Sequence, residues 1–386
     1  MSFQAYLAAA ETKAGLTRRE RAALSRRSPP PKWRSTPAPT MLVLPEVKVN
    51  DLNRGRQRPS IYDVAKQAGV SHMTVSRVLN GHPNIRDSTR GRVLKAIDEM
   101  KYTRSSIARA LATRRAMRIG VLVDAPLQYG PNSTLRALEG AARQVGYAIS
   151  AFSISDDEQS QINDGVVELV TQGVDALCVI APRASSLDIL RQQSTGLPTI
   201  VVKAEQDDVW HSVAVDQRAG ATLAVTHLIE RGHRSILHLS GPLDWYDARE
   251  REGGWRDALA LAGLPIPKSL SGDWTSDFGY AIGRDFEPNG VTAVFAANDQ
   301  MALGFVHGLW EQGLRVPQDI SVVGFDDLPD ARHFLPPLTT VRQDFAALGE
   351  LALQQIIAAI DGDAQVQHDM IEPKLIVRSS TAHPSA

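Results

Sequence analysis

Apolar residues between positions 60 and 82 recur every three or four residues, which is the spacing of one face of a helix. The set is Ile61, Val64, Ala65, Ala68, Val70, Val75, Val78 and Leu79. Gly69 interrupts this spacing, so the segment is predicted to form two short helices around a tight turn. The second helix keeps a polar, basic face outside this small core. A helix-turn-helix presents such a face to the major groove of DNA, and an ordinary helical hairpin is the alternative.

The pattern changes after Arg118, where short apolar runs alternate with amphipathic stretches. The runs are IGVLV, AISAFSI, VDALCVIA, PTIVVK, SVAVD, SILHLS, TAVFAA and ISVVGF. Short runs rich in Val and Ile are typical of strands buried on both faces. The stretches between them include QRAGATLAVTHLIERG, which Gly232 is expected to end at its C-cap. Strands alternating with helices predict doubly wound parallel sheets, and the roughly 270 residues available suffice for two lobes.

Charge is distributed unevenly along the 386 residues, whose net charge is −1 at pH 7. Residues 1–58 carry 12 Lys and Arg against 4 Asp and Glu, and residues 59–112 carry 9 against 4. Residues 113–386 carry 21 basic against 35 acidic side chains. A basic front end on an acidic body is typical of a protein that contacts phosphates with one end only. Such a distribution also makes DNA binding sensitive to salt.

Several features favour a cytoplasmic binding protein over an exported, membrane or catalytic one. The single cysteine, Cys178, lies in the apolar run DALCVIA, so we expect a buried thiol and no disulfide framework. No run of about 18 apolar residues and no signal-peptide pattern occurs. His233 is expected to be structural, and no metal-ligand cluster, phosphate loop or catalytic triad pattern is recognisable. The sequence therefore predicts a cytoplasmic, nucleoid-associated protein that is not an enzyme and requires no cofactor.

Residues 1–58 are rich in Arg, Ser and Pro and are expected to form a disordered basic extension. One interpretation is that the segment is a functional tail. Two other interpretations give it no role. One is a solvated extension, and the other is a start assigned too early, with Met41 as the true start. Together these two are favoured over a specific function.

The segment IYDVAKQAGVSHMTVSRVLNG resembles the DNA-binding headpiece of the LacI/GalR repressor family. GHPNIRDSTRGRVLKAIDEMKY is similar to the family's third helix, and SSIARALATRR is similar to its hinge helix. Four further motifs, RGHRSILHLSGP, ANDQMALG, GLRVPQDISVVGFDD and PPLTTVRQDF, occur in the family's order. The resemblance covers about residues 59 to 380 and disfavours the ordinary hairpin.

The resemblance implies an α/β core of two doubly wound, periplasmic-binding-protein-like lobes behind an all-α helix-turn-helix headpiece. The implied parts are a headpiece at 59–102, a hinge helix and linker at 103–116, a two-lobed core at 117–380 and a tail at 381–386. Within the core, the first lobe is expected at 117–215 plus 344–372. The second lobe is expected at 216–343 plus the last strand, with a ligand in the cleft between the lobes.

By the same resemblance, His72 and Met73 occupy the main base-reading positions of the recognition helix. Arg77 suits a bidentate contact to guanine. The other residues assigned to DNA contacts are Ser60, Tyr62, Ser71, Thr74, Ser76, Asn80, Tyr102 and Ser105. For any single polar residue, a solvated helix face is the alternative.

Residues 103–113 are too short and too polar to form a stable isolated helix. The resemblance implies that this hinge becomes helical on DNA, pairs with its dimer mate and inserts Leu111 into the minor groove. Ala108 would permit the close approach of the two hinges. Packing of Leu111 against the core is the alternative, and the wedge is favoured because the flanking residues are Arg and Ala.

The resemblance places three ligand-contacting residues in the core. Arg251, Asn298 and Asp326 match the family's hydroxyl-binding positions, and together their donors and acceptors suit vicinal hydroxyls. Asn298 and Asp326 follow predicted strands, where open α/β sheets bind ligands. Trp274 matches an aromatic residue of the cleft, and Gln343 and Phe345 match the lobe-crossing strand beneath it. Singly, each would more often be a surface or capping residue.

Four residues depart from the family pattern. Trp245 and Asp247 stand where small residues are expected, and they would narrow the pocket or add a hydroxyl contact. Asp124 replaces a smaller hydroxyl residue and is included in the pocket. Lys203 stands where a carboxylate is expected. These departures affect which sugar would bind.

The resemblance implies a homodimeric transcriptional regulator, in the first instance a repressor, on a pseudo-palindromic double-stranded DNA operator. Its effector is expected to be a small carbohydrate such as a galactoside or another pyranoside. Two alternatives stay open: a nucleobase or nucleoside corepressor, and a sugar solute-binding protein, which would have no use for a headpiece. The absence of C-terminal leucine heptads favours dimers over tetramers.

Overall fold

The computed structural model describes residues 59–79, 81–102, 115–125, 127–154, 159–181, 183–193, 195–206, 209–362 and 367–385. The chain divides into two compact units, Met1–Tyr102 and Thr103–Ala386. The predicted extension at 1–58 and most of the predicted hinge lie outside the described residues. In the described part, no helix is long and apolar enough to span a membrane.

Three helices form the headpiece: α3 (Ile61–Ala68), α4 (His72–Leu79) and α5 (Asp87–Glu99). Ser60 begins α3 with a capping box, in which its side chain accepts from the Asp63 amide and the Asp63 carboxylate accepts from the Ser60 amide. Gly69 ends α3 at a φ of 62°, a left-handed conformation that glycine adopts without steric cost. The apolar residues that predicted the two helices lie in one cluster with the buried face of α5.

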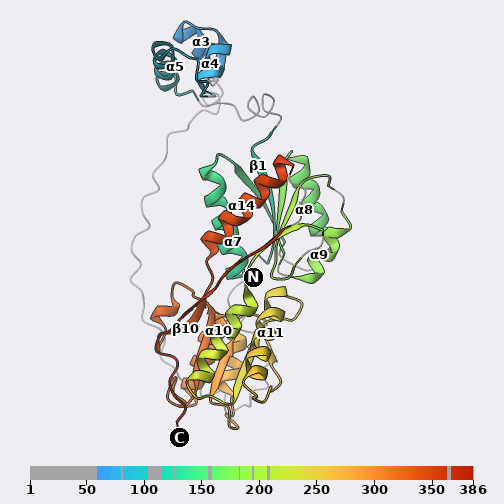
Figure 1. Ribbon diagram of the computed structural model, residues 1–386, viewed down its shortest axis with the longest axis vertical. Helices are drawn as coiled ribbons and strands as arrows, with labels where there is room; N and C mark the ends of the chain where they lie inside the picture. The colour runs from blue at the N-terminus through green and yellow to red at the C-terminus, as the bar shows by residue number, and fades with distance from the viewer. Residues whose placement is uncertain are drawn as a thin grey trace, which may run out of the picture. The chain divides into compact units, whose positions relative to one another are not determined.

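The first lobe of the second unit is a six-stranded sheet with the order β11-β5-β4-β3-β1-β2, and every neighbouring pair is parallel. The strands are β1 Arg118–Asp124, β2 Ala148–Ile154, β3 Ala176–Ile180, β4 Thr199–Val202, β5 His211–Val215 and β11 His368–Ile371. Helices cover both faces of this sheet (Figure 1): α7 (Tyr129–Gln144) and α14 (Phe345–Asp361) one face, α8 (Gln159–Thr171) and α9 (Ala184–Arg191) the other.

The second lobe repeats this plan with the strand order β12-β10-β9-β8-β6-β7, in which only the β10–β12 pair is antiparallel. The strands are β6 Ile236–Ser240, β7 Leu270–Ser271, β8 Ala293–Ala296, β9 Ser321–Asp326, β10 Thr339–Arg342 and β12 Lys374–Ile376. On one face lie α10 (Gln217–Glu230) and α11 (Tyr246–Leu261), and on the other α12 (Ser276–Arg284) and α13 (Asp299–Glu311). A 3-10 turn, Ala331–His333, precedes β10.

The chain crosses between the lobes three times: after β5, after β10 and between β11 and β12. All eight apolar runs identified in the sequence contain strands, and the alternation of strand and helix produces two doubly wound sheets. The predicted fold class is confirmed. The carboxyl ends of the strands of both sheets lie at the junction of the lobes, so the cleft is formed where open α/β sheets hold ligands.

Helices α12 and α13 pack at a distance that only glycine permits. A Cβ atom at Gly304 would overlap the backbone oxygen of Ser276. We expect Gly304→Ala to lower the free energy of unfolding by about 1 to 3 kcal/mol or more, since two helix backbones would have to separate. A matched control is Gly140→Ala in α7, where a Cβ meets no atom within 4 Å, and it should be neutral or slightly stabilising. Equal denaturation midpoints for both variants would contradict this packing argument.

Candidate recognition helix and interlobe cleft

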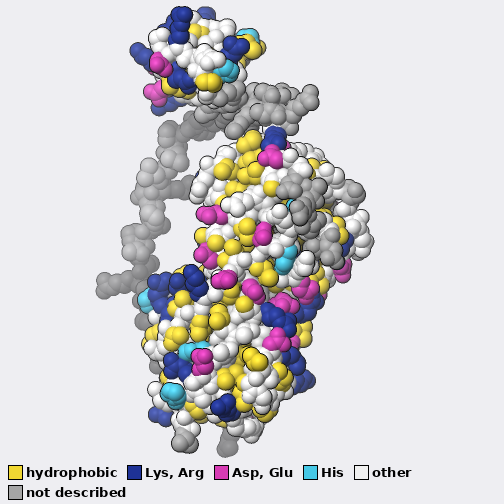
Figure 2. Space-filling model, in the orientation of Figure 1, with side chains coloured by type: hydrophobic (Ala, Val, Ile, Leu, Met, Phe, Trp, Pro, Cys, Tyr) yellow, Lys and Arg dark blue, Asp and Glu magenta, His cyan; other side chains and the backbone are white. Residues whose placement is uncertain are grey.

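Helix α4 buries one face and exposes the other, as its sequence pattern predicts. Val75 and Val78 are buried in the headpiece core. His72, Met73 and Arg77 are exposed, Met73 to 55%, although a large apolar side chain in the open is usually unfavourable. Figure 2 shows basic side chains spread over the visible face of the headpiece, with fewer acidic ones. The geometry therefore presents the predicted base-reading residues to solvent.

Several of the predicted DNA-contacting hydroxyls already have partners in the headpiece. Ser60 Oγ donates to Asp63 Oδ2 at 2.7 Å. Ser71 Oγ lies 3.0 Å from Thr74 Oγ1 and accepts from the Thr74 amide at 3.2 Å, so it stabilises the start of α4. These contacts position the helices. The Ser60 hydroxyl hydrogen is used by Asp63, whereas one hydroxyl of the Ser71–Thr74 pair keeps a hydrogen for a phosphate oxygen.

The remaining predicted DNA residues fall into three groups. The Tyr62 ring is exposed, 5.0 Å from the His72 ring. Ser76 is partly buried, and Tyr102 packs against the headpiece core. The other predicted residues, Asn80, Ser105, Ala108 and Leu111, lie outside the described residues.

Two adjoining cavities form the cleft between the lobes. The first-lobe cavity encloses about 420 Å³ of empty space, and the second-lobe cavity about 320 Å³. Both include Gly130 and Pro131 at the start of α7 and Asp247 on α11, so they are parts of one cleft. Both volumes include space that is open to solvent.

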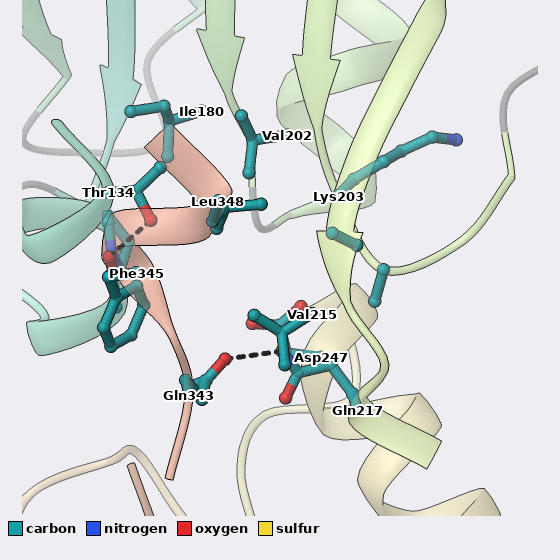
Figure 3. Close-up of a pocket in the computed structure, with 14 residues that line it drawn as sticks. Thr134, Ile180, Val202, Lys203, Val215, Gln217, Asp247, Gln343, Phe345 and Leu348 are labelled. Carbon is teal, nitrogen blue, oxygen red and sulfur yellow. Dashed lines mark hydrogen bonds between the residues drawn. The ribbon is translucent and has the colours of Figure 1, made fainter. Parts of the chain in front are cut away.

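The structure brings six predicted residues together in the second-lobe cavity: Trp245, Asp247, Arg251, Trp274, Asn298 and Asp326. Gln343 and Phe345 line the first-lobe cavity, together with Thr134 and Leu348 (Figure 3). These eight predicted residues come from five local structures: the start of α11, the loop before α12, the N-cap of α13, the end of β9 and the crossing after β10.

Arg251 closes a ring of four polar side chains at the floor of the cleft. Its Nε donates to Gln217 Oε1 at 2.8 Å, and Gln217 Nε2 donates to Gln343 Oε1 at 2.8 Å. Gln343 Nε2 donates to Asp326 Oδ1 at 2.7 Å, and that oxygen lies 3.5 Å from Arg251 Nη2. Figure 3 shows the Gln217–Gln343 bond between the two crossing segments. The ring therefore ties the ligand-facing arginine to two of the three lobe crossings.

Because these charged side chains are buried, each affects the pKa of its neighbours. Arg251 is 3% exposed, its guanidinium carbon lies 3.9 Å from the centre of the Phe325 ring, and its Nη1 donates to the Ala297 carbonyl. Burial raises the pKa of Asp326 to about 6, although Arg251 and Gln343 act in the opposite direction. Burial also raises the pKa of Asp247, whose carboxylate lies 3.8 Å from Arg251.

The raised pKa of Asp326 predicts an unusual pH dependence. The folded chain holds this proton more tightly than the unfolded chain, so the contribution of Asp326 to stability is largest below about pH 4 and decreases as pH rises to about 6. Over that window, the unfolding free energy of wild type should therefore fall relative to that of Asp326→Asn. A difference independent of pH, measured by denaturant unfolding, would show that Asp326 titrates normally.

Asn298 has two structural tasks, a helix cap that the sequence analysis allowed as an alternative and a second one that it did not indicate. Its Oδ1 accepts from the Met301 amide at 2.9 Å and caps α13, and its Nδ2 donates to the Trp274 carbonyl at 2.9 Å. Trp274 adopts a φ of +71° and lies 5.2 Å from Trp245, ring centre to ring centre. Asn298 thus holds the aromatic wall of the cavity, with one amide hydrogen left for a ligand.

Two buried polar atoms on the second-lobe cavity have no hydrogen-bond partner in the part of the chain that the structure describes: Trp274 Nε1, a donor, and Gln300 Oε1, an acceptor. Buried polar groups are rarely left unpaired, so a polar ligand is the expected partner. Sequence reasoning missed Gln300 and Gln217. The first lies two residues after Asn298, and the second directly follows the first lobe crossing, which are the signals that could have identified them.

Asp124 does not line either cavity, contrary to its assignment to the pocket. Its carboxylate accepts from Arg183 Nε at 2.8 Å and from Ser186 Oγ at 2.6 Å. The physical reason is that a carboxylate 1% exposed binds the nearest cation, which Arg183 on the neighbouring loop supplies. Lys203 lines the first-lobe cavity, but its ammonium group donates to the Gln206 carbonyl at 3.1 Å.

The start of α11 also joins the two lobes. Tyr246 belongs to the second lobe but packs in the core cluster of the first lobe. Arg249 pairs with Glu205 at 2.9 Å, Ser185 Oγ donates to Asp244 at 2.8 Å, and Arg183 forms a backbone bridge with Trp245. The helix that carries Asp247 and Arg251 is therefore fixed to the opposite lobe.

Two residues considered for chemistry are structural. His233 lies 2.9 Å from Thr292 Oγ1 and 3.0 Å from the Ala382 carbonyl, and burial lowers its pKa. Cys178 is fully buried in the first sheet, which raises the pKa of its thiol to about 12. Among the described residues, no group of three or more His, Cys, Asp or Glu could hold a metal ion.

Comparison with known proteins agrees with this geometry. Residues 60–105 match the model for bacterial regulatory proteins of the lacI family, and residues 225–381 match the periplasmic-binding-protein-like domain. The lactose operon repressor of Escherichia coli is 32% identical over 329 residues, covering 84% of this chain and 91% of the relative. The ribose operon repressor of the same species is 34% identical over 326 residues, covering 82% and 98%.

Solved structures are similar over the same region. A lac repressor dimer bound to operator and the anti-inducer ONPF is 31% identical with a TM-score of 0.75, covering 84% of this chain and all of that one. The complex of the transcriptional regulator CelR with cellobiose is 29% identical with a TM-score of 0.63 over the same shares. These relatives are regulators rather than enzymes. The chain belongs to the LacI family of DNA-binding transcriptional regulators.

Proposed function

We propose that this protein represses transcription by binding a pseudo-palindromic operator as a homodimer, and that a small carbohydrate in the interlobe cleft weakens this binding. The observation that carries the proposal is the ring Arg251–Gln217–Gln343–Asp326, which joins a polar cavity to two lobe crossings. Such a regulator acts in the cytoplasm at the nucleoid.

Support for DNA binding comes from α4. Its exposed residues include Arg77, whose planar fork of donors matches the O6 and N7 acceptors of guanine in the major groove. His72 and Met73 at its start would meet base edges. A similar dimer is bound to operator in the lac repressor structure. The unlike residues at the start of α4 in different family members would give different operators.

Support for a homodimer comes from the outer face of α13. Leu303 and Trp310 are 40% and 72% exposed there, with the Tyr280 and His307 rings beside them at 4.9 Å from each other. Exposed aromatic and aliphatic side chains grouped on one helix face favour association with a second copy. A two-fold dimer would in turn present two headpieces to two half-sites.

Support for a carbohydrate comes from the lining of the cleft. Aromatic faces at Trp245 and Trp274 suit the C–H face of a sugar ring, and Arg251, Asp326 and Gln300 supply donors and acceptors for its hydroxyls. The relatives include lactose and ribose operon repressors and a regulator complexed with cellobiose.

The ring of side chains suggests how binding would reach the DNA. A ligand that accepts hydrogen bonds from Arg251 and donates one to Asp326 competes with Gln217 and Gln343, and so changes the preferred angle of the lobes. The effector shifts the equilibrium only by its difference in affinity between the two lobe arrangements. Reorientation of the first lobe would separate the paired hinges and release the operator.

A nucleobase or nucleoside corepressor is the second candidate, and the relatives also include the HTH-type transcriptional repressor PurR of Haemophilus influenzae, 34% identical over 334 residues. A panel of pyranoses, disaccharides and nucleobases distinguishes the two. We expect one sugar to raise the thermal unfolding midpoint by mass action, and the rise to be absent in Arg251→Ala. A rise with a purine and with no sugar would overturn the carbohydrate proposal.

A further inference from the structure

The second-lobe cavity contains more negative than positive charge. Asp247 and Asp326 both line it, and Arg251 is its only lining cation among the described residues. The Arg251 guanidinium already has several partners. Its Nε donates to Gln217, and its Nη1 donates to the Ala297 carbonyl. Its Nη2 lies 3.5 Å from Asp326 and 3.8 Å from Asp247. At 3.8 Å, the link to Asp247 is an ion pair beyond hydrogen-bond distance.

The cation of the adjoining cavity, Lys203, does not point toward Asp247. Lys203 lines the adjoining first-lobe cavity, but Figure 3 shows its side chain extending away from Asp247 and Gln343. Its ammonium group donates to the Gln206 carbonyl and lies 4.9 Å from the centre of the Tyr246 ring. Lys203 therefore does not neutralise Asp247.

The lining of the same cavity favours a group that donates hydrogen bonds. Gln300 Oε1 is a buried acceptor without a partner, and the Asp247 side chain remains 29% exposed toward the cleft. Trp245 and Trp274 form an edge-to-face pair on the wall. An alkylammonium ion has three donors and no acceptor, and aromatic faces attract it.

The two carboxylates of the cavity act on each other, since Asp247 contributes to the raised pKa of Asp326. A cation entering the cavity would relieve this repulsion, whereas a neutral sugar would leave it.

We propose that the effector is a sugar that carries a protonated amine, an amino sugar of hexose size, with its ammonium group beside Asp247 and Gln300. This inference rests on the proposed carbohydrate function and narrows it. The hydroxyls of the same sugar would use Arg251, Asp326 and the unpartnered Trp274 Nε1.

The test measures the affinity of the full chain at pH 7 for glucosamine and galactosamine, each beside its N-acetyl derivative and its parent hexose, by calorimetric titration. We expect one amino sugar to bind at least 10-fold more tightly than both neutral counterparts. In Asp247→Asn the ratio of amino-sugar affinity to parent-hexose affinity should fall below about 3-fold, since the ammonium group loses its counter-charge. The matched control is Asp257→Asn on the same helix, which removes an exposed carboxylate paired with Arg218 outside both cavities.

The outcomes separate the two proposals. Equal or tighter binding of a neutral sugar overturns the ammonium site and leaves the carbohydrate function standing. An unchanged amine preference in Asp247→Asn also overturns the assigned site. Absence of binding by every sugar overturns both proposals. If Asp247→Asn fails to fold, the amine preference should instead weaken with added salt in wild type, and a preference independent of salt contradicts the charge argument.

Discussion

Arg251→Ala is expected to abolish the response to effector while the protein still binds its operator. Arg251 supplies the cavity's guanidinium and one corner of the ring that reaches Gln217 and Gln343. Its loss removes charge-assisted hydrogen bonds to the ligand and leaves Asp326 and Asp247 without a cation. We therefore expect effector affinity to fall at least about 30-fold, since truncating one partner of a buried charged pair costs about 2 to 5 kcal/mol.

The same substitution should also affect stability in a way that depends on pH. Without Arg251, the pKa of Asp326 should rise further, so the carboxyl group takes up a proton and avoids part of the cost of an unpaired buried charge. The variant should consequently be destabilised more at pH 8 than at pH 5. Denaturant unfolding at the two pH values measures this difference.

A matched control is Arg256→Ala, five residues along the same helix. Arg256 is half exposed and pairs with Glu252 at 2.9 Å, outside both cavities. Because this pair lies outside both cavities, effector affinity should change less than about 2-fold. A normal effector response in Arg251→Ala would remove this residue from the site, and the loss of operator binding would show that it supports the fold instead.

Arg77→Ala is expected to weaken specific operator binding by about 5- to 150-fold, which corresponds to about 1 to 3 kcal/mol for a lost bidentate base contact. Binding to unrelated DNA should change much less, so the ratio of specific to non-specific affinity should fall. The substitution removes an exposed side chain from α4 and leaves the buried residues Val75 and Val78 in place, so the headpiece should remain folded.

Lys95→Ala is the control for total charge. Lys95 is an exposed cation on α5, 3.8 Å from Glu99. Removing it should weaken specific and non-specific binding to a similar, small extent. Equal losses for Arg77→Ala on both kinds of DNA would show that Arg77 contacts phosphate and does not read a base.

The fold could be predicted because its signals are local and repeated. The buried strands are short, mostly apolar runs, and the headpiece helices have regular apolar spacing with Gly69 between them. The three aligned ligand positions Arg251, Asn298 and Asp326 also converge in the structure, because each follows a strand end or lies in the first turns of a helix at the same edge of the sheet.

The rest depends on contacts between distant segments. Asp124 was predicted to be a ligand residue, but its carboxylate binds Arg183, which lies 59 positions away in the sequence. Gln217 and Gln343 have ordinary surroundings in the sequence, and only the fold brings them within hydrogen-bond distance across 126 positions. The capping role of Asn298 competes with its ligand role, and sequence pattern alone does not separate the two.

In the proposed mechanism, occupation of the cleft controls DNA binding. The most direct test of this mechanism is fluorescence anisotropy of the full chain on a duplex selected by the protein itself, with and without the sugar that gives the largest rise in unfolding midpoint. We predict that the sugar weakens specific binding of wild type at least 10-fold and does not affect that of Arg251→Ala. Identical affinity of wild type with and without a bound sugar would contradict the account, and tighter binding would contradict release in favour of a corepressor.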